Sequence, residues 1–333
     1  MLVTGGASFI GSHLTEALLG LGAEVRVADD LSSGRLDNLA AVLGDIELHE
    51  VDLRDPAAAA RAVAGCASVF HLAADHGGRG YIEQHEVACS SNFALDQTVF
   101  AAARRAGCEQ VTFASSACVY PVGLQSSLEE TVALREDHVG PPFDPDGLYG
   151  LAKLAAERTL EAMATEDGMA TAACRFFTVY GPRNPESHAL TAMIARAFVG
   201  TDPFEIWGDG EQRRNWTHVD DIVRGTVLAA ERLTSGAVNL GSTRSWSVRE
   251  AAEAVLALTG HDTPIRPRPD MPTGPRNRVA DGSRALELLG FAPEVDLADG
   301  LASTIDWYFA THDRARVRAD LDHLLQERAE PGS

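Results

Sequence analysis

Tyr149 and Lys153 are a pair of residues whose types and spacing suit proton chemistry. Lys153 is the single lysine among 28 basic residues, and it follows Tyr149 by four positions. Residues four apart lie on one face of a helix, so the ammonium can sit beside the phenol and favour its phenolate. Arginine suits such a compact position poorly. The pair predicts a tyrosine base with a lysine that also holds a ribose; the alternative is a chance lysine in an arginine-rich chain.

A glycine-rich turn follows the first expected strand, in the run Thr4-Gly5-Gly6-Ala7-Ser8-Phe9-Ile10-Gly11. A strand that passes through such a turn into a helix presents backbone N–H groups to a pyrophosphate. Gly5 permits the tight turn, and Gly11 permits close packing of helix on strand. Ser8 stands where a third glycine is usual, and its hydroxyl could donate to a phosphate. We expect contacts with a dinucleotide from Gly5, Ser8, Phe9, Ile10 and Gly11, although such a run also occurs as a plain strand-to-helix turn.

Carboxylates at the ends of the next strands predict how the adenosine half of that dinucleotide is held. Asp29 ends the second expected strand, where a carboxylate can accept both ribose hydroxyls and repels a 2′-phosphate. NAD is therefore expected rather than NADP. Asp30 is expected to be a solvated turn residue. Asp52 and Leu53 follow the third strand and either frame the adenine or serve as turn chemistry.

The elements that position these residues alternate between strand and helix. Strands are expected at 2–4, 24–27, 46–48, 68–71, 111–114 and 171–174, and helices at 11–21, 35–43, 56–64, 84–106 and 148–166. Such alternation predicts an α/β fold, a doubly wound parallel sheet of the Rossmann type with its ligand at the carboxyl ends of the strands. After residue 176 the pattern is irregular and rich in Pro and Gly. We expect a cofactor domain over 1–175, with a returning segment near 219–243, a smaller C-terminal substrate-binding lobe over 176–333, and a charged helix after His312.

Composition narrows the function classes. The net charge of −20 would repel nucleic acid and anionic membranes. Five cysteines at unpatterned spacings predict reduced thiols rather than a disulfide frame. The sequence has no long apolar run, begins directly with an expected strand, and shows no metal-ligand pattern. We therefore expect a cytoplasmic protein with no membrane or nucleic-acid partner and no metal.

Further motifs give the chain its resemblance to a known family. They are His71-Leu72-Ala73-Ala74, Ser115-Ser116, Arg175-Phe176, Tyr180-Gly181-Pro182, Gly208-Asp209-Gly210 and Val219-Asp220-Asp221. With the tyrosine–lysine pair, they resemble the extended short-chain dehydrogenases/reductases that act as NAD-dependent nucleotide-sugar epimerases and dehydratases. The resemblance implies that Tyr149 removes a hydroxyl proton and that Ser116 orients the sugar hydroxyl. It also implies that Lys153 holds the nicotinamide ribose and that Ala73 contacts the NAD.

Within this family, the chain is most similar to the branch that inverts carbon centres of GDP-linked hexoses. Dehydratases carry an Asp-Glu pair after the serine, whereas this chain has Ala117-Cys118. The similarity makes Cys118 the candidate that removes or returns a proton at a sugar carbon, the alternative being a small buried hydrophobe. In that branch a lysine is the acid that partners the cysteine, and the equivalent position in this chain is His188. His188 is either a titratable replacement for that lysine or a surface histidine. Where the branch has an asparagine near the sugar, this chain has Thr178.

Arginines and a glycine complete the expected substrate site. The resemblance places Arg214 and Arg276 on the diphosphate, which two fork-shaped donors suit. Gly78 and Arg79 are expected near the sugar. Arg213 and Arg278 are interpreted as solvated charges.

The resulting hypothesis is an NAD-dependent nucleotide-sugar epimerase. It would form a transient 4-keto sugar, favour a GDP-hexose substrate, and form a homodimer through the helices expected at 84–106 and 148–166. The alternatives are a UDP-sugar 4-epimerase on the same scaffold and a catalytically silent NAD-sensing protein.

Overall fold

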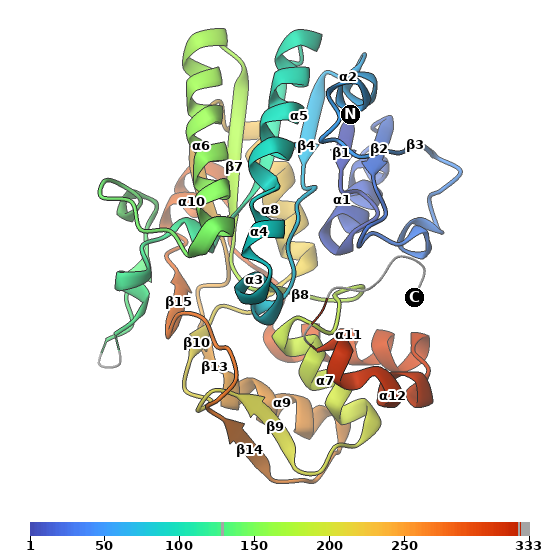
Figure 1. Cartoon of the computed structure of the whole chain (residues 1–333), viewed down its shortest axis with the longest axis vertical. Helices are drawn as coiled ribbons and strands as arrows, with labels where there is room; N and C mark the ends of the chain where they lie inside the picture. Colours follow the sequence, from blue (N-terminus) through green and yellow to red (C-terminus); the bar gives the residue numbers. More distant parts are fainter. Residues whose placement is uncertain (128–129, 326, 328–333) are drawn as a thin grey trace.

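A seven-stranded parallel sheet forms the upper body of the molecule (Figure 1). The computed structural model describes residues 1–127, 130–325 and 327. In the order β12-β7-β5-β4-β1-β2-β3, the strands are Ala237–Leu240, Ala170–Phe176, Gln110–Ser116, Ser68–His71, Leu2–Thr4, Val25–Asp29 and Ile46–Glu50. Every neighbouring pair is parallel. The chain order reverses between β1 and β4, and such a switch point opens a ligand crevice at the carboxyl ends of the strands. The predicted fold class is confirmed.

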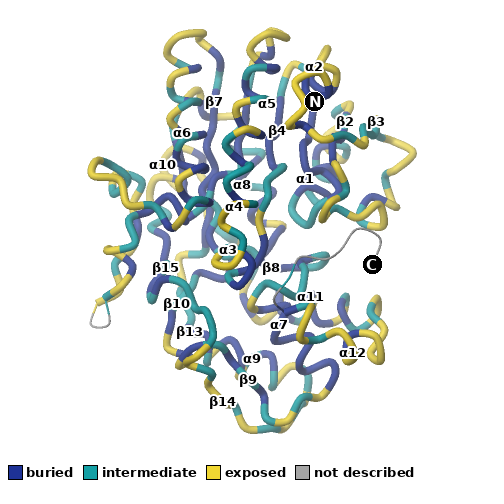
Figure 2. Tube along the Cα trace, in the orientation of Figure 1, coloured by how far each residue is buried: buried dark blue, intermediate teal, exposed yellow. Residues whose placement is uncertain are grey.

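Helices cover both faces of this sheet. One layer contains α2 (Pro56–Val63), α5 (Asn92–Ala106) and α6 (Gly147–Asp167), and the other contains α1 (Phe9–Gly20), α8 (Val219–Arg232) and α10 (Ser283–Leu289). Because both faces are covered, the inner strands are largely buried, whereas the edge strand β3 is half-buried to exposed (Figure 2). The hydrophobic runs in the sequence therefore correspond to a sheet interior.

Local sequence signals explain where several helices begin and end. Asp55 accepts a hydrogen bond from the Ala57 N–H, and Pro56 occupies the first helical position of α2. Helix α9 (Val248–Thr259) begins with a capping box formed by Ser247 and Glu250. Helix α6 ends at Gly168, whose positive φ of 67° suits a glycine.

Two predicted helices differ from the structure. The helix expected at 35–43 is only a 3-10 turn, Leu36–Leu39, because Asn38 donates its side-chain N–H to the Ala7 carbonyl and so holds the glycine-rich turn. The helix expected at 84–106 is divided into the end of α3 (Arg79–Gln84), α4 (Glu86–Cys89) and α5. His85 has a non-helical backbone between α3 and α4.

Within the described part of the chain, the lower body is built from short strands and four helices. The strands form three small sheets: β13-β10-β15-β6 (Trp246–Ser247, Arg213–Arg214, Asn277–Ala280 and Ala133–Leu134), β11-β8 (Thr217–His218 and Val179–Tyr180) and β14-β9 (Ile265–Arg268 and Phe204–Trp207). The helices are α7 (Ala189–Val199), α9, α11 (Leu297–Thr311) and α12 (Arg314–Leu324), packed around a core that includes Ile194, Phe198, Leu301 and Tyr308.

Segments far apart in the sequence cross between the two bodies. Residue 175 is the boundary that the sequence predicts between the two parts. Strand β6 precedes this boundary yet pairs with β15 of the lower body. The elements α8, β12 and α10 follow the boundary yet pack with the parallel sheet. The charged helix expected after His312 is α12, and it packs on α7. The two bodies are thus interwoven at the level where the strands of the sheet end.

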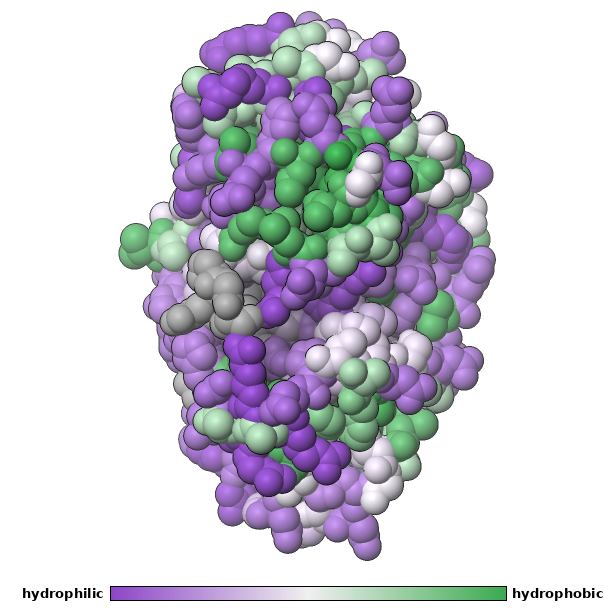
Figure 3. Space-filling model, turned by 90° about the vertical axis from the view of Figure 1, so that its right-hand side faces the viewer, coloured by the Kyte–Doolittle hydropathy of each residue, from purple (hydrophilic) through white to green (hydrophobic). Residues whose placement is uncertain are grey.

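The side of the molecule that carries β3 is largely hydrophilic, with hydrophobic side chains gathered on its upper half (Figure 3). Among the described residues, no helix has the length and apolar character needed to cross a membrane.

Candidate functional site

The glycine-rich turn is packed too closely for side chains at two of its positions. Gly5 has a positive φ of 67°, and a Cβ there would lie 2.8 Å from the Ala73 nitrogen. A Cβ on Gly11 would lie 2.1 Å from the Gly5 carbonyl oxygen, so helix α1 rests directly on the turn. The Ser8 hydroxyl donates to that same carbonyl at 2.5 Å. Ser8 therefore braces the turn from within, which differs from the expected donation to a phosphate.

Asp29 lies at the carboxyl end of β2 and holds the backbone around it. Its carboxylate accepts the Ala7 N–H and the Leu31 N–H, each at 2.9 Å. Burial raises the pKa of Asp29, and those two hydrogen bonds oppose the rise. Because a carboxylate can accept about four hydrogen bonds, Asp29 retains acceptor capacity for ribose hydroxyls.

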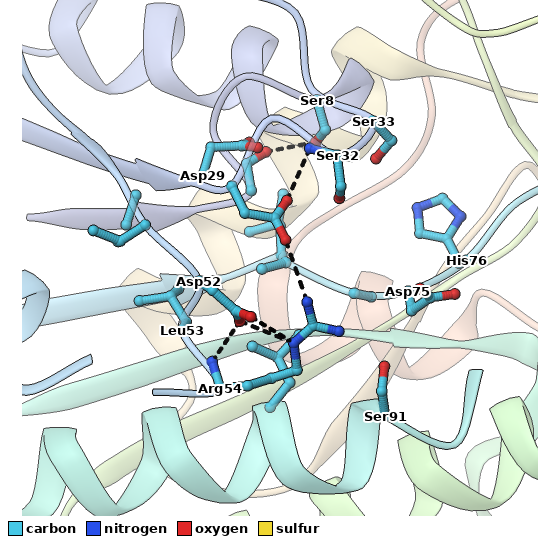
Figure 4. Close-up of a pocket in the computed structure, with 18 residues that line it drawn as sticks. Ser8, Asp29, Ser32, Ser33, Asp52, Leu53, Arg54, Asp75, His76 and Ser91 are labelled. Carbon is cyan, nitrogen blue, oxygen red and sulfur yellow. Dashed lines mark hydrogen bonds and ion pairs between the residues drawn. The ribbon is translucent and has the colours of Figure 1, made fainter. Parts of the chain in front are cut away.

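Arg54 lines the same pocket as Asp29, and the sequence interpretation missed it. Its Nε donates to Asp52 at 2.9 Å, as Figure 4 shows. Its Nη2 lies 3.6 Å from the Asp30 carboxylate. Asp30 is therefore part of the pocket wall rather than only a solvated turn residue. The available signal was a basic residue two positions after Asp52, which itself follows β3.

These residues fit a dinucleotide. The pocket in Figure 4 is lined by residues expected to bind the cofactor, namely Gly5, Ser8, Asp29, Asp52, Leu53 and Ala73. It has a glycine turn on one side and a hydroxyl-binding carboxylate on the other, which is the arrangement that a pyrophosphate and an adenosine ribose require. Ser8 also lines a second and larger cavity, in which Phe9 and Ile10 are found.

The larger cavity has a volume of about 1000 Å³ and brings together the predicted reactive residues. Its walls include Ser116, Cys118, Tyr149, Lys153, Thr178 and His188. Ser116 ends β5, Cys118 lies in the 3-10 turn that follows, and His188 precedes α7. A space of this size accommodates a drug-sized or sugar-nucleotide-sized ligand.

The tyrosine–lysine pair lies on one face of α6, as its spacing predicts. The Lys153 ammonium lies 4.4 Å from the centre of the Phe113 ring and 5.8 Å from that of the Tyr149 ring. Burial raises the pKa of Tyr149, the Cys118 sulfur adds to the rise, and a hydrogen bond with Ser116 opposes it. Burial lowers the pKa of Lys153. The expected phenolate is therefore not favoured by the protein alone, because desolvation outweighs the distant ammonium.

Cys118 is held by an arginine that was interpreted as a solvated charge. The Arg278 Nη1 donates to the Cys118 sulfur at 3.2 Å, and the Nη2 donates to Asp146 at 2.6 Å. The interpretation of Arg278 was wrong, because strand β15 lies beside β6 and β10 and turns this side chain into the protein interior. All five cysteines are free thiols.

His188 stands at the start of α7 with a second histidine beside it. The rings of His188 and His76 lie 6.2 Å apart, and His76 lies 6.4 Å from the Tyr149 ring. Burial lowers the pKa of His188 to about 4. The imidazole is thus neutral at pH 7, with a free nitrogen to accept a proton, although the lowered pKa makes it a weaker base than an ordinary histidine. His76 was not predicted as a site residue, although it lies within the same sequence stretch as Gly78.

The remaining predicted substrate residues have partners within the protein. A Cβ on Gly78 would lie 1.7 Å from the Ser187 carbonyl oxygen, so α3 begins directly against the loop that carries His188. Arg79 donates to Glu83 and Asp146 at 2.6 and 2.7 Å.

The two arginines expected on the diphosphate also have internal partners. Arg214 donates to three backbone carbonyls, and burial lowers its pKa to about 9. Arg276 pairs with both oxygens of Asp209. Neither arginine is among the residues that line the two cavities described above.

A buried network behind the site explains two of the sequence motifs. The Ser115 hydroxyl donates to Glu157 at 2.5 Å, and Arg175 donates to the same carboxylate from Nε and Nη2. Ser115 thus belongs to this network, whereas the Ser116 hydroxyl hydrogen-bonds with Tyr149. Arg175 positions the sheet and α6, whereas Ser116 faces the cavity.

Comparisons with known proteins show the family to which the chain belongs. Residues 1–241 match the sequence model of the NAD dependent epimerase/dehydratase family. A GDP-mannose 3,5-epimerase from Oryza sativa subsp. japonica is 35% identical over 310 residues, which cover 92% of this chain and 80% of that protein. A dTDP-glucose 4,6-dehydratase from Streptomyces griseus is 34% identical over 318 residues, 92% of this chain and 93% of the dehydratase.

A solved structure shows the same fold. The UDP-glucose 4-epimerase of Thermus thermophilus, in complex with NAD, superposes with a TM-score of 0.83 and 26% identity. The similarity covers 93% of this chain and 99% of that one.

Proposed function

Since this chain belongs to the NAD-dependent epimerase/dehydratase family, we propose that it is a nucleotide-sugar epimerase that inverts C5 of GDP-mannose, with or without C3. The product of inversion at C5 alone is GDP-L-gulose, and inversion at both carbons gives GDP-L-galactose. The reaction has no net redox change.

The observation that carries the proposal is the placement of Cys118 and His188 in the same cavity as Ser116, Tyr149 and Lys153. The last three residues suit oxidation of a sugar hydroxyl. The first two add groups that can exchange protons with a carbon, and they come from separate elements, the turn after β5 and the start of α7. Inversion at a carbon needs an acid and a base on opposite faces of the sugar ring.

The first step removes two hydrogens at C4. NAD, held by the turn at Gly5 and by Asp29, would supply the hydride acceptor and donor for C4. Tyr149, as the phenolate, takes the proton of the C4 hydroxyl, and Ser116 orients that hydroxyl. Because burial raises the pKa of Tyr149, the phenolate requires further positive charge, which Lys153 and a cationic nicotinamide ring provide. The C4 oxygen becomes a carbonyl.

The second step exchanges a proton at C5, which the C4 carbonyl makes acidic. His188, neutral because burial lowers its pKa to about 4, takes the C5 proton and becomes imidazolium. Cys118 delivers its thiol proton to the opposite face and becomes thiolate. Return of the hydride to C4, with the proton from Tyr149, then gives the inverted hexose. The same pair serves C3 when the keto sugar turns in the cavity.

The GDP-hexose preference is supported by the relatives and by the Ala117-Cys118 sequence. The Oryza sativa protein at 35% identity is named as a GDP-mannose 3,5-epimerase. The half-buried guanidinium of Arg214, whose three hydrogen bonds all go to backbone carbonyls, is a cation that a diphosphate could pair with. Opening of the Arg276–Asp209 ion pair would supply a second guanidinium.

Incubation with GDP-mannose in deuterated water tests this function. We expect deuterium at C5 of recovered sugar nucleotides and an L-configured product by NMR, with loss of inversion at C5 in Cys118→Ser. Hexose recovered without deuterium at C5 would contradict the mechanism.

A UDP-sugar 4-epimerase is the second candidate, favoured by the fold similarity to the Thermus thermophilus enzyme. Such an enzyme interconverts C4 epimers without exchange at carbon, and it tolerates Cys118→Ala. If the protein converts no nucleotide sugar in a test panel, it is instead a non-catalytic NAD-binding protein.

The proposal also includes a cytoplasmic homodimer formed through α5 and α6, which lie side by side in Figure 1. Leu151 on α6 and Val87 on the adjoining α4 are exposed hydrophobic residues, which such an interface would cover. Light scattering after size-exclusion chromatography distinguishes a dimer from a monomer.

A further inference from the structure

The hydrogen bond between Arg278 and Cys118 joins residues 160 positions apart in the chain. Each of the three side-chain nitrogens of Arg278 donates a hydrogen bond. Nη1 donates to the Cys118 sulfur, Nη2 to Asp146, and Nε to Gln125 at 2.8 Å. The Arg278 side chain is only 12% exposed. A guanidinium with three fixed partners has one orientation, and in this case it is directed at the sulfur.

Asp146 fixes the arginine and the cysteine together. Its side chain accepts hydrogen bonds from Arg278 and Arg79, at 2.6 and 2.7 Å. Its backbone N–H donates to the Cys118 carbonyl at 2.8 Å. The thiol, its cation and the anion that holds the cation are therefore one packed unit at the start of α6.

Arg79 extends this unit toward His188. It lies in the first turn of α3, directly after Gly78, whose Cα packs on the Ser187 carbonyl. The two groups proposed to exchange protons with carbon are thus braced against each other through Arg79 and Asp146.

The charges that face the Cys118 sulfur are predominantly positive. Besides Arg278 these are Lys153 from α6 and Arg214 from β10, while Asp146 contributes the opposing carboxylate and Tyr149 a neutral phenol. Of the cations, Arg278 is the one with a hydrogen bond to the sulfur. An adjacent cation and a donated hydrogen bond both favour a thiolate over a thiol.

We propose that Arg278 is a positioning residue that makes Cys118 a competent proton carrier, by orienting its sulfur and stabilising the thiolate that remains after the thiol proton has gone to carbon. The inference rests on the proposed function, because it concerns the same sulfur. In the delivery step the S–H bond breaks, the C–H bond forms, and the negative charge passes from the enolate to the sulfur, where Arg278 receives it. In the reverse direction the same thiolate is the base.

Alkylation of the free protein by iodoacetamide tests this inference without any turnover. The rate at Cys118 is followed by peptide mass spectrometry from pH 5 to 10, because the thiolate is the form that reacts. In Arg278→Gln, which lacks the cation that donates to the sulfur, we expect alkylation of Cys118 at pH 7 to be about tenfold slower. Arg213→Gln is the matched control, since Arg213 lies on the neighbouring strand β10 and donates to Ser245 instead. Its profile should equal that of the native chain.

Arg278→Lys separates charge from folding. Lysine retains a positive charge but lacks the several donor nitrogens of a guanidinium. The alkylation rate of Cys118 at pH 7 should therefore lie between the rates of the native chain and of Arg278→Gln. If Arg278→Gln does not fold, as judged by thermal melting, the shift in Arg278→Lys decides. A profile unchanged in the folded variants overturns the inference, even when epimerase activity is lost. An Arg278-dependent profile without C5 exchange on any nucleotide sugar would instead refute the proposed function and leave the role of Arg278 standing.

Discussion

Acidification below pH 7 tests the proton state of His188. The base proposed for C5 must be the neutral imidazole, so exchange at C5 is lost as the pH falls through the pKa of His188. Burial lowers this pKa to about 4. At pH 5.5 such an imidazole is about 97% neutral, whereas an ordinary one, with a pKa of about 6.5, is about 9% neutral. Between pH 7 and 5.5 we therefore expect almost no loss of the His188-dependent rate, against about an eightfold loss for an unperturbed histidine.

The assay is deuterium incorporation at C5, measured as kcat/KM over pH 4 to 8. Reduction of the bound cofactor, followed by absorbance in single turnover, reports the C4 step separately and serves as an internal reference that does not use His188. His76→Asn is the matched control variant, because His76 is the other imidazole that faces His188. Its removal should leave the acid side of the C5 profile unchanged.

An acid limb with a midpoint near 6.5 in C5 exchange, absent from the C4 step and retained in His76→Asn, would refute the assignment of a neutral, desolvated His188. An exchange rate that rises as the pH falls would show that His188 acts as the acid instead.

Three further predictions concern the cofactor and the loop that carries His188. Lys153→Arg should slow C4 oxidation by about 100-fold or more, since a guanidinium does not fit the buried position of an ammonium; a near-native single-turnover rate would contradict this. Asp29→Asn should reduce the preference for NAD over NADP by about tenfold in equilibrium binding, because a negative charge facing the 2′-phosphate is removed; an unchanged ratio would argue against ribose recognition at Asp29. Gly78→Ala should impair C5 exchange more than C4 oxidation, because its Cβ would lie 1.7 Å from the Ser187 carbonyl. Gly20→Ala, where nothing lies within 4 Å, is the control and should melt at or above the native temperature.

The parallel sheet and its cofactor edge could be predicted from the sequence because their signals are local. Alternating apolar and helical segments specify a doubly wound sheet. The glycines at 5 and 11 and the carboxylate at 29 lie within one βαβ unit, so their spacing along the chain is also their spacing in space. The same holds for Tyr149 and Lys153, one helical turn apart on α6.

The extent of the helices was predicted less well, because side chains that serve another element interrupt them. Asn38 is an example: its amide bonds to Ala7, 31 residues earlier, and a turn forms where the pattern indicated a helix. The helix propensity of residues 35–43 carries no information about a contact with a residue this far away in the sequence.

The partners of the charged residues were decided by the tertiary structure alone. Arg276 immediately precedes strand β15 and Arg278 lies within it. The sequence pointed to Arg276 as functional. In the fold, Arg276 pairs with Asp209, whereas Arg278 reaches Cys118. Similarly, the chain shows that position 188 is a histidine, but burial sets its pKa. Hydrogen bonds and desolvation depend on which segments meet in space, and spacing along the chain does not specify that for residues more than 100 positions apart.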